Sequence, residues 1–414
     1  MTTPDRLSPR GVVRGTDVLV VGAGVCGLAA ALGFARAGFD TVLAGAPEQL
    51  ASGRTVALLD SSVRFLSRLG VEDDLKRLGA PLRSLRIVDD TGSLWRAPTI
   101  EFHAAQIGLS SFGWNIENVK LVNALAALAA RQERLALSSS RIASYEWGDR
   151  ALARSEDGSI FEARLVVAAD GRNSPARAAA GIDVRVRRLE QHALTAMLAH
   201  SRPHDERSTE FHTRDGPFTL VPLPARDDGW SRSSLVWVMP KTQARRRTAL
   251  DDASLAGEIE FQAQSIYGAM QIEGGRGAFA LSSQRADRLT GPRLALVGDA
   301  AHVLPPIGAQ GLNLGLRDAA WLVETSEAKR RSGADFGAAP SLGRYESARR
   351  GDVALRAGAI DALNFSLVAD FALADFARSL GLAALGAIGP LRRLVMREGV
   401  SPGLATPSVM RREG

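Results

Sequence analysis

The stretch that decides the fold reads Asp17-Val-Leu-Val-Val-Gly22-Ala-Gly24-Val-Cys-Gly27. It begins as a short apolar run of the kind that forms a buried parallel strand. A glycine-rich turn follows, and alanine- and leucine-rich sequence then continues to Ala37, where Gly38 supplies a helix stop. A second apolar run, Thr41–Ala44, closes the unit. The pattern predicts strand, helix and strand of a Rossmann-like dinucleotide-binding fold.

Each glycine of this turn has a physical task. Gly22 permits the tight turn, Gly24 lets the backbone approach a pyrophosphate, and Gly27 lets the helix pack closely on the strand. The start of the helix offers unpaired N–H groups to the phosphates. The acid that usually binds the ribose is absent, because Ala44 stands at the end of the second strand; we expect Arg54 to supply this contact.

Only one GxGxxG fingerprint occurs in the chain. An enzyme that binds NAD(P)H through its own Rossmann domain would usually show a second one. We therefore expect a resident FAD, with NADH or NADPH binding transiently as a co-substrate.

Two further strands end in small, acidic turns. The first runs Leu165-Val-Val-Ala-Ala-Asp170-Gly171 and leads to Arg177. The second is Arg293-Leu-Ala-Leu-Val-Gly298-Asp299, followed by Ala300-Ala-His302-Val-Leu-Pro305-Pro306-Ile-Gly308-Ala-Gln310-Gly311-Leu312-Asn313 and a helix through Asp318. An acid at a strand end can accept from a ribitol hydroxyl. A glycine turn before a helix offers donors where negative charge collects on a reduced flavin.

Together the three stretches resemble the single-component FAD aromatic hydroxylases. The resemblance implies that the first glycine motif binds the ADP half of FAD, that Gly298 and Asp299 face ribitol and isoalloxazine, and that Asp170, Gly171 and Arg177 serve both FAD and NAD(P)H. It also implies that NAD(P)H reduces FAD and that one oxygen atom of O2 passes to an electron-rich aromatic ring, while the other leaves as water.

A narrower resemblance is to the ubiquinone-biosynthesis hydroxylases. It rests on Gly53-Arg54-Thr55-Val-Ala-Leu58, Asn115-Ile-Glu-Asn118, Gly216-Pro-Phe-Thr-Leu-Val-Pro222 and the unbroken Gly298–Asp318 segment, within about residues 17–396. It implies a polyprenylated phenol as substrate. The cofactor-binding residues that it implies beyond those already named are Arg54, Asn118, Pro306, Gly308, Gly311, Leu312 and Asn313. The flavin-adjacent catalytic candidates are His302, Pro305 and Gln310, with an orienting role for His302 as the alternative.

These assignments predict an α/β (α+β) two-domain architecture. Residues 14–82, 104–183 and 283–345 form the FAD-binding domain, and residues 83–103 and 184–282 form an antiparallel-sheet substrate domain. Within the latter, Leu85–Trp95 reads as a hairpin that turns at Asp90–Gly92. Residues 346–414 form a C-terminal helical region, in which apolar Leu380–Ile388 precedes Arg392, Arg393 and Arg397. This tail predicts either a packing helix pair or an interfacial contact with a membrane.

Composition narrows the function classes. The single cysteine, Cys26, excludes a disulfide framework and a thiolate metal cage, and we expect no metal site. The formal net charge of +6 lies in scattered arginines without stacking aromatics, so we expect no nucleic-acid partner. Without a signal peptide or an apolar span, we expect a cytoplasmic location, with peripheral contact to the inner membrane or to a quinone-biosynthesis complex as open alternatives. The rival functions are hydroxylation of another aromatic molecule, a halogenase or prenyl reductase, and a non-catalytic FAD-binding subunit.

Overall fold

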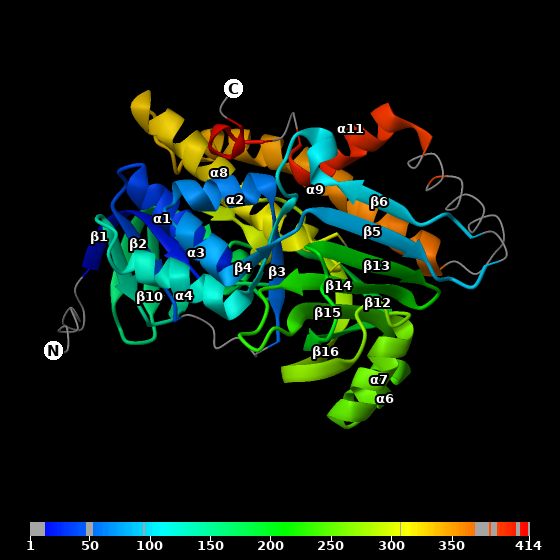
Figure 1. Ribbon diagram of the computed structural model, residues 1–414. Coiled ribbons are helices and arrows are strands. Elements are labelled where there is room, and N and C mark those ends of the chain that lie inside the picture. Colours follow the sequence, from blue (N-terminus) through cyan, green and yellow to red (C-terminus); the bar gives the residue numbers. More distant parts are fainter. Residues whose placement is uncertain are drawn as a thin grey trace.

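The described part of the chain is organised by two eight-stranded sheets and one three-stranded sheet. Figure 1 shows how these sheets and the helices are arranged. The computed structural model describes residues 13–46, 53–93, 96–306, 308–368, 381, 387–402 and 406–412. The expected fold class is confirmed: a Rossmann-like half carries one large sheet, and the second large sheet is almost entirely antiparallel.

The first large sheet has a parallel centre in the order β18-β11-β1-β2-β8. Its outer strands β17, β9 and β10 pair antiparallel to it. The strands span β1 Val13–Val21, β2 Thr41–Ala44, β8 Leu135–Ser138, β9 Ile142–Trp147, β10 Ala151–Ser155, β11 Ile160–Ala168, β17 Thr290–Gly291 and β18 Leu294–Leu296. The last four residues of β1 and of β11 are buried, as their unbroken apolar runs predict.

Helix α1 (Val25–Arg36) is the predicted helix of the glycine motif, and it is buried along nearly its whole length. Small alanines allow this, because α1 packs against both α4 and α8. The other helices of this half are α2 Asp60–Arg68, α3 Glu72–Leu78, α4 Asn118–Ala129, α5 Pro175–Ala179 and α8 Gln310–Arg331.

The second large sheet has the order β19-β16-β12-β15-β14-β13-β5-β6. Its strands are β5 Ser84–Asp89, β6 Ile100–His103, β12 Val184–His200, β13 Arg207–Thr213, β14 Gly216–Leu223, β15 Ser231–Pro240, β16 Met270–Ala286 and β19 His302–Val303. All neighbours are antiparallel except β13 and β5, which run parallel. Helices α6 (Lys241–Thr248) and α7 (Asp252–Gln262) cover one face of this sheet (Figure 1).

The hairpin prediction for Leu85–Trp95 is confirmed for its first strand and wrong for the position of its second. Strand β5 ends at Asp89 and pairs antiparallel with β6, but β6 starts only at Ile100, beyond the predicted bounds. The physical reason is the Asp89 carboxylate, which accepts from the backbone N–H groups of Thr91 and Ala97 and so holds the longer connection.

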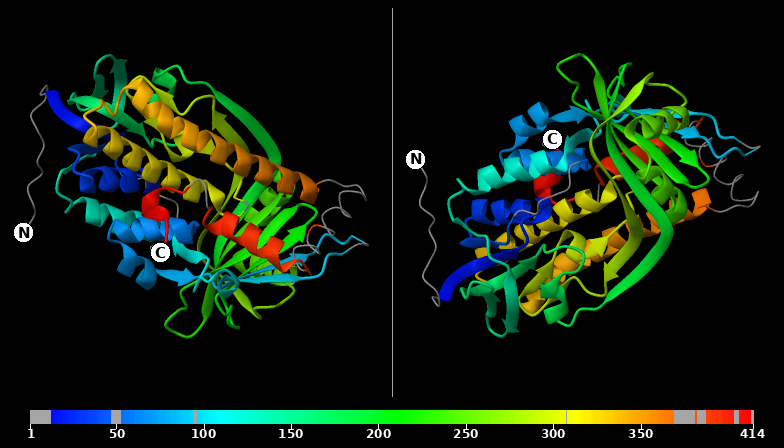
Figure 2. Two further views of the ribbon diagram at one scale, coloured as in Figure 1. Left: turned by 90° about the horizontal axis from the view of Figure 1, so that it is seen from above. Right: turned by 90° about the horizontal axis from the view of Figure 1, so that it is seen from below.

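A small sheet and a long helix join the two halves. The small sheet consists of β3 Thr55–Leu59, β7 Gly113–Glu117 and β4 Gly79–Pro81. Helix α9 (Ala339–Val368) runs beside α8, as the view from above shows (Figure 2). It contacts β17 of the first large sheet and β14 of the second. Helix α11 (Gly389–Val400) follows. Most of the predicted apolar tail stretch Leu380–Ile388 lies outside the described residues.

Candidate functional site

The three sequence motifs meet at one edge of the first large sheet. Strands β18, β11 and β1 are parallel neighbours, so their carboxyl ends lie together. Gly22 follows β1, Asp170 follows β11 and Gly298 follows β18. In open parallel sheets, ligands bind outside this edge.

The three glycines of the first turn differ in what surrounds them. A Cβ on Gly22, which has a φ of +104°, would lie 2.3 Å from the Ala169 oxygen, and a Cβ on Gly27 would lie 1.8 Å from the Gly22 oxygen. Packing alone therefore requires both. A Cβ on Gly24 would meet nothing within 4 Å, and no side chain caps the start of α1. Gly24 thus leaves open the space in front of the helix N–H groups.

A glycine contact that the sequence analysis missed links the first and last motifs. The Cys26 thiol of α1 lies between Gly298 and Gly315 of α8: a Cβ on Gly315 would lie 2.5 Å from the Cys26 Sγ atom, and one on Gly298 would lie 3.0 Å from it. Small residues let α1 and α8 cross closely here. The repeated glycines after Gly298 were the available signal.

The Asp170 turn lies against the Gly298 turn. Arg177 is buried and donates to the Ala300 oxygen at 2.8 Å and to the Arg172 oxygen at 3.0 Å. The Asp170 Oδ2 atom accepts from the Ala176 N–H at 3.1 Å, whereas the buried Oδ1 atom has no partner among the residues that the structure describes. Burial raises the pKa of Asp170. Gly171 has a φ of +84°, a conformation that favours glycine.

Arg54 and Asn118 lie between the two halves. The Asn118 N–H donates to the Arg54 oxygen at 3.0 Å, and the Arg54 guanidinium lies 4.9 Å from the centroid of the Phe279 ring of β16. Within the described part of the chain, the buried Asn118 Oδ1 atom has no partner.

The turn before α8 contains the remaining predicted residues. Pro305 is buried, Pro306 is half-buried, and Gly308 and Ala309 both adopt left-handed conformations before the helix starts. Gly311 and Leu312 are half-buried in the first helical turn, and Asp299 is exposed at the nearby edge.

Asn313 is fully buried, and its side chain is hydrogen-bonded to backbone atoms of the protein. Its carboxamide donates to the Ala57 and Ala309 oxygens at 2.9 and 2.6 Å and accepts from the Leu59 N–H at 2.8 Å. The side chain predicted to bind cofactor thus ties α8 to the small sheet, and both of its N–H donors are used within the protein.

His302 belongs to a buried ionic network. Its Nε2 atom lies 2.7 Å from the Asp318 Oδ2 atom, and neither side chain has any exposed surface. Asp318 also accepts from the Gly298 N–H at 3.1 Å and from the Arg349 Nε atom at 2.6 Å. Burial alone would raise the pKa of Asp318, but the charges of His302 and Arg349 hold this pKa below its usual value. These contacts favour an orienting role for His302.

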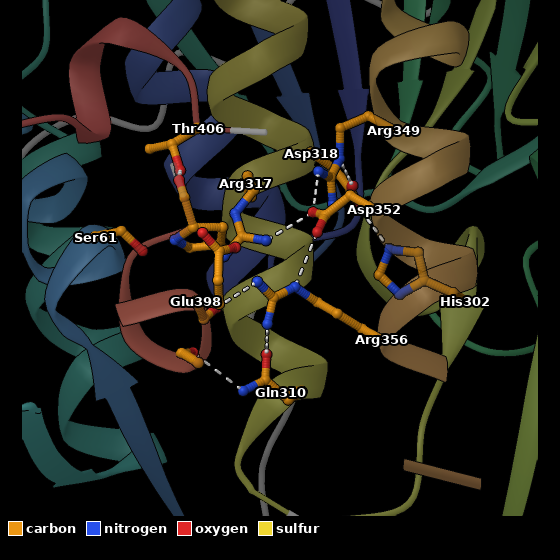
Figure 3. Close-up of polar contacts among 12 residues, drawn as sticks. Ser61, His302, Gln310, Arg317, Asp318, Arg349, Asp352, Arg356, Glu398 and Thr406 are labelled. Atoms are coloured by element: carbon orange, nitrogen blue, oxygen red, sulfur yellow. Dashed lines mark hydrogen bonds and ion pairs between the residues drawn. The ribbon is translucent and has the colours of Figure 1, made fainter. Parts of the chain in front are cut away.

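The network continues to the end of α11 (Figure 3). The Asp352 carboxylate pairs with Arg349, Arg317 and Arg356 at 2.5, 2.6 and 2.9 Å. Arg356 then donates to the Gln310 Oε1 atom and to the Glu398 oxygen, both at 2.9 Å. Gln310, the first residue of α8, is thereby held between α9 and α11. Sequence analysis missed this network, although the spacing of 349, 352 and 356 on one helix face was a usable signal.

The geometry fits a dinucleotide. The open space at Gly24 would be filled by a side chain, and two buried oxygens, on Asp170 and Asn118, lack partners among the described residues. Within these residues no group of three His, Cys, Asp or Glu side chains is arranged to hold a metal ion.

Comparison with known proteins agrees with this arrangement. The FAD binding domain family matches residues 15–326. The ubiquinone hydroxylase UbiL of Rhodospirillum rubrum is 35% identical over 95% of this chain and 92% of its own length. The 3-demethoxyubiquinol 3-hydroxylase of Escherichia coli is 32% identical over 92% of this chain and 97% of its own length.

Solved structures share the fold. The p-nitrophenol 4-monooxygenase of Pseudomonas putida superimposes with a TM-score of 0.75 at 18% identity, covering 93% of this chain and 98% of its own. HpxO of Klebsiella pneumoniae, complexed with FAD, has a TM-score of 0.73 at 20% identity, covering 95% of this chain and 99% of its own.

Proposed function

The chain belongs to the FAD-dependent hydroxylases of ubiquinone biosynthesis, and from this premise we propose that it hydroxylates the ring of a polyprenylated phenol. FAD is its cofactor, and NADH or NADPH and O2 are the co-substrates. The observation that carries the proposal is the convergence of the Gly22, Asp170 and Gly298 turns at one sheet edge.

The position of each residue around the carboxyl edge of the first large sheet indicates which part of FAD it would hold. The open start of α1 at Gly24 takes the pyrophosphate, and Arg54 and Asn118 take the adenosine side. Asp299 would accept from ribitol, and the turn before α8 would line the isoalloxazine with Pro306, Gly308, Gly311 and Leu312. Asp170 and Arg177 lie beside this region and also serve the nicotinamide.

When bound, FAD supplies the electron transfer from NAD(P)H and the activation of O2. The protein positions the cofactor and substrate and supplies the charges around the flavin. The N-terminus of α8 places a positive partial charge beside the site, which stabilises negative charge on a reduced flavin ring. His302, Asp318 and Gln310 hold the turn that carries this helix start, while Pro305 shapes its wall.

The test uses the purified full chain. It should be yellow, should release FAD rather than FMN on denaturation, and should consume NAD(P)H with a prenylated phenol while the product gains one oxygen atom. A protein that retains FAD but shows neither NAD(P)H oxidation nor product would favour the non-catalytic subunit. A colourless protein that ignores added FAD would end the proposal.

We further propose a peripheral membrane contact through α11. No helix among the described residues combines the length and the apolar character needed to cross a bilayer. On α11, however, Leu391, Leu394 and Val395 are 37%, 58% and 45% exposed, and Arg393 and Arg397 lie beside them. An apolar helix surface flanked by cations suits an anionic lipid surface, from which a polyprenylated substrate could be taken.

Co-sedimentation with anionic vesicles tests this contact. Leu394→Glu should abolish binding, whereas Phe261→Glu on α7, where Phe261 is 85% exposed, should not. Equal binding by both variants would contradict the membrane contact. Binding to a quinone-biosynthesis protein but not to vesicles would assign α11 to a complex instead.

A further inference from the structure

One face of the second large sheet is turned toward the proposed flavin site. The Ser234 hydroxyl of β15 accepts from the Thr55 Oγ1 atom at 2.8 Å and from the Asn115 Nδ2 atom at 3.1 Å, both on the small sheet. Phe279 of β16 lies under the Arg54 guanidinium. The opposite face packs on α6 and α7. Side chains on the Ser234 face therefore point toward the region where substrate must meet the cofactor.

The strand register places an acidic residue and a histidine on this face. Side chains alternate along a strand, so Val236 shares the face of Ser234. Val236 pairs with Thr219, and Thr219 pairs with Glu210. Paired residues project to the same face of an antiparallel sheet, so Glu210 lies on the Ser234 face, and His212 lies there two residues further along β13.

Glu210 and His212 form a pair that is only partly satisfied. The His212 Nε2 atom lies 2.9 Å from the Glu210 Oε1 atom, and Thr219 donates to the Glu210 Oε2 atom at 3.3 Å. The side chains of His212 and Glu210 are 3% and 14% exposed. The His212 Nδ1 atom is buried without a partner among the described residues. A carboxylate accepts about four hydrogen bonds, so Glu210 retains acceptor capacity for a ligand.

The surroundings of this pair combine two polar neighbours with apolar ones. Thr219 is a strand partner of Glu210. Asp89, whose carboxylate accepts from backbone N–H groups, is a strand partner of His212. The other neighbouring positions on the same face are apolar: Ile87, Val221 and Val236. A phenol with a prenyl chain has this same division into one hydroxyl and a large apolar surface. Binding sites for such ligands place few polar groups within an apolar lining.

Among the described residues, the other histidines and the tyrosines lie elsewhere. His302 is paired with Asp318, and His200 is bonded to the Arg202 oxygen and to Ser233 on the α7 side of the sheet. His204 is bonded to the Leu223 oxygen, His192 lies on the α6 and α7 face, and His103 is exposed on β6. The three tyrosines also lie elsewhere: Tyr145 on β9, Tyr267 against Thr209 on the opposite face, and Tyr345 on α9 bonded to the Leu296 oxygen.

We propose that Glu210, held by His212, binds the phenolic hydroxyl of the substrate and takes its proton. This inference rests on the proposed function. The phenolic O–H bond breaks, a new O–H bond forms on the Glu210 carboxylate, and the electron pair stays on the phenolic oxygen. The ring becomes more electron-rich and so accepts the oxygen atom more readily. Glu210 is the catalytic residue, and His212 is a positioning residue that donates to the carboxylate.

Glu210→Gln tests the proton transfer, because glutamine keeps the shape and one acceptor but cannot take the proton. We expect hydroxylated product to form on the order of a hundredfold more slowly, the effect of losing a general base. FAD content and the rate of flavin reduction by NAD(P)H should stay at wild-type values. His212→Asn should give a smaller loss of the same kind. The matched controls lie on the opposite side of the sheet: Glu258→Gln, on α7 in a pair with exposed Arg246, and His192→Asn, on the face that packs on α6 and α7.

A substrate analogue makes the test independent of folding. The methyl ether of the phenol has no O–H to donate, so the wild-type protein should bind it about tenfold more weakly than the phenol, the loss of one charge-assisted hydrogen bond. Glu210→Gln should show a smaller preference for the phenol, because its neutral amide oxygen accepts a weaker hydrogen bond than a carboxylate does. Equal preference for the phenol in both proteins, or unchanged turnover in Glu210→Gln, would overturn the inference. A wild-type protein that hydroxylates nothing would instead overturn the proposed function.

Discussion

Asp318→Asn probes the buried network with one nearly isosteric change. Asparagine can still accept from the Gly298 N–H, but it removes the negative charge that faces Arg349 and His302. The network has three arginines, at 317, 349 and 356, and two aspartates, so its charge without His302 rises from +1 to +2. Removing one partner of a buried ion pair costs about 3–5 kcal/mol.

This loss of unfolding free energy can be measured as a fall in the melting temperature Tm. The unfolding entropy of a 414-residue chain that unfolds as one unit is about 0.9 kcal/mol/K near 60 °C. A loss of 3–5 kcal/mol therefore lowers Tm by about 3–6 °C. Thermal melts followed by circular dichroism at pH 7, with saturating FAD, measure this difference. The matched control is Asp74→Asn, whose carboxylate forms an exposed pair with Arg77 and should change stability by less than about 1 kcal/mol.

The pH dependence supplies a second check. Because the pKa of Asp318 is lowered in the folded state, its contribution is full above the unfolded pKa of about 3.9 and is lost as pH falls through the folded pKa. The difference in Tm between wild type and variant should thus be constant near neutrality and shrink below about pH 4. A variant that melts with the wild type at pH 7 would refute the argument that this charge stabilises the network.

The remaining predictions concern the cofactor turns. Gly24→Val should lose FAD, while the free energy of unfolding of the apoprotein should fall by only about 1 kcal/mol, because the added Cβ meets no protein atom. Gly27→Val should fail to fold, because its Cβ would overlap the Gly22 oxygen. Measurements of FAD release and of thermal melting distinguish the two outcomes. Asp299→Ala should weaken FAD binding roughly tenfold or more without loss of fold, and an unchanged fluorescence titration would leave Asp299 without a ribitol contact. Asp170→Ala should slow flavin reduction by NAD(P)H in stopped-flow experiments; an unchanged rate would remove its nicotinamide role.

The parts of the fold that sequence could predict are those with strong local causes. The strand, turn and helix around Gly22 combine an apolar run, obligatory glycines and a helix stop, and each feature acts within about 20 residues of the others. The strands β14 and β15 likewise follow from apolar, β-branched runs. The hairpin after β5 failed because the Asp89 side chain, rather than the turn sequence, sets the length of the connection.

The individual roles of the site residues depend on partners that are distant in sequence. The resemblance to the ubiquinone-biosynthesis hydroxylases implied a cofactor role for Asn313, yet its carboxamide is bonded to backbone atoms on either side of residue 58. Glu210 lies in a strand whose alternation indicates two faces but not which one meets the other half of the molecule. Only the pairing of β13 with β14, and the bonds from Ser234 to the small sheet, decide this.

The buried network illustrates what polar side chains provide that apolar side chains at the same positions would not. Arg356 donates to both Gln310, where α8 starts, and Glu398, near the end of α11. Apolar packing is non-directional, so it would permit these two ends to slide past each other. Hydrogen bonds from one planar guanidinium fix both ends in one geometry. The contacts that are costly to bury therefore set the position of the proposed flavin turn relative to the helix that we propose contacts the membrane.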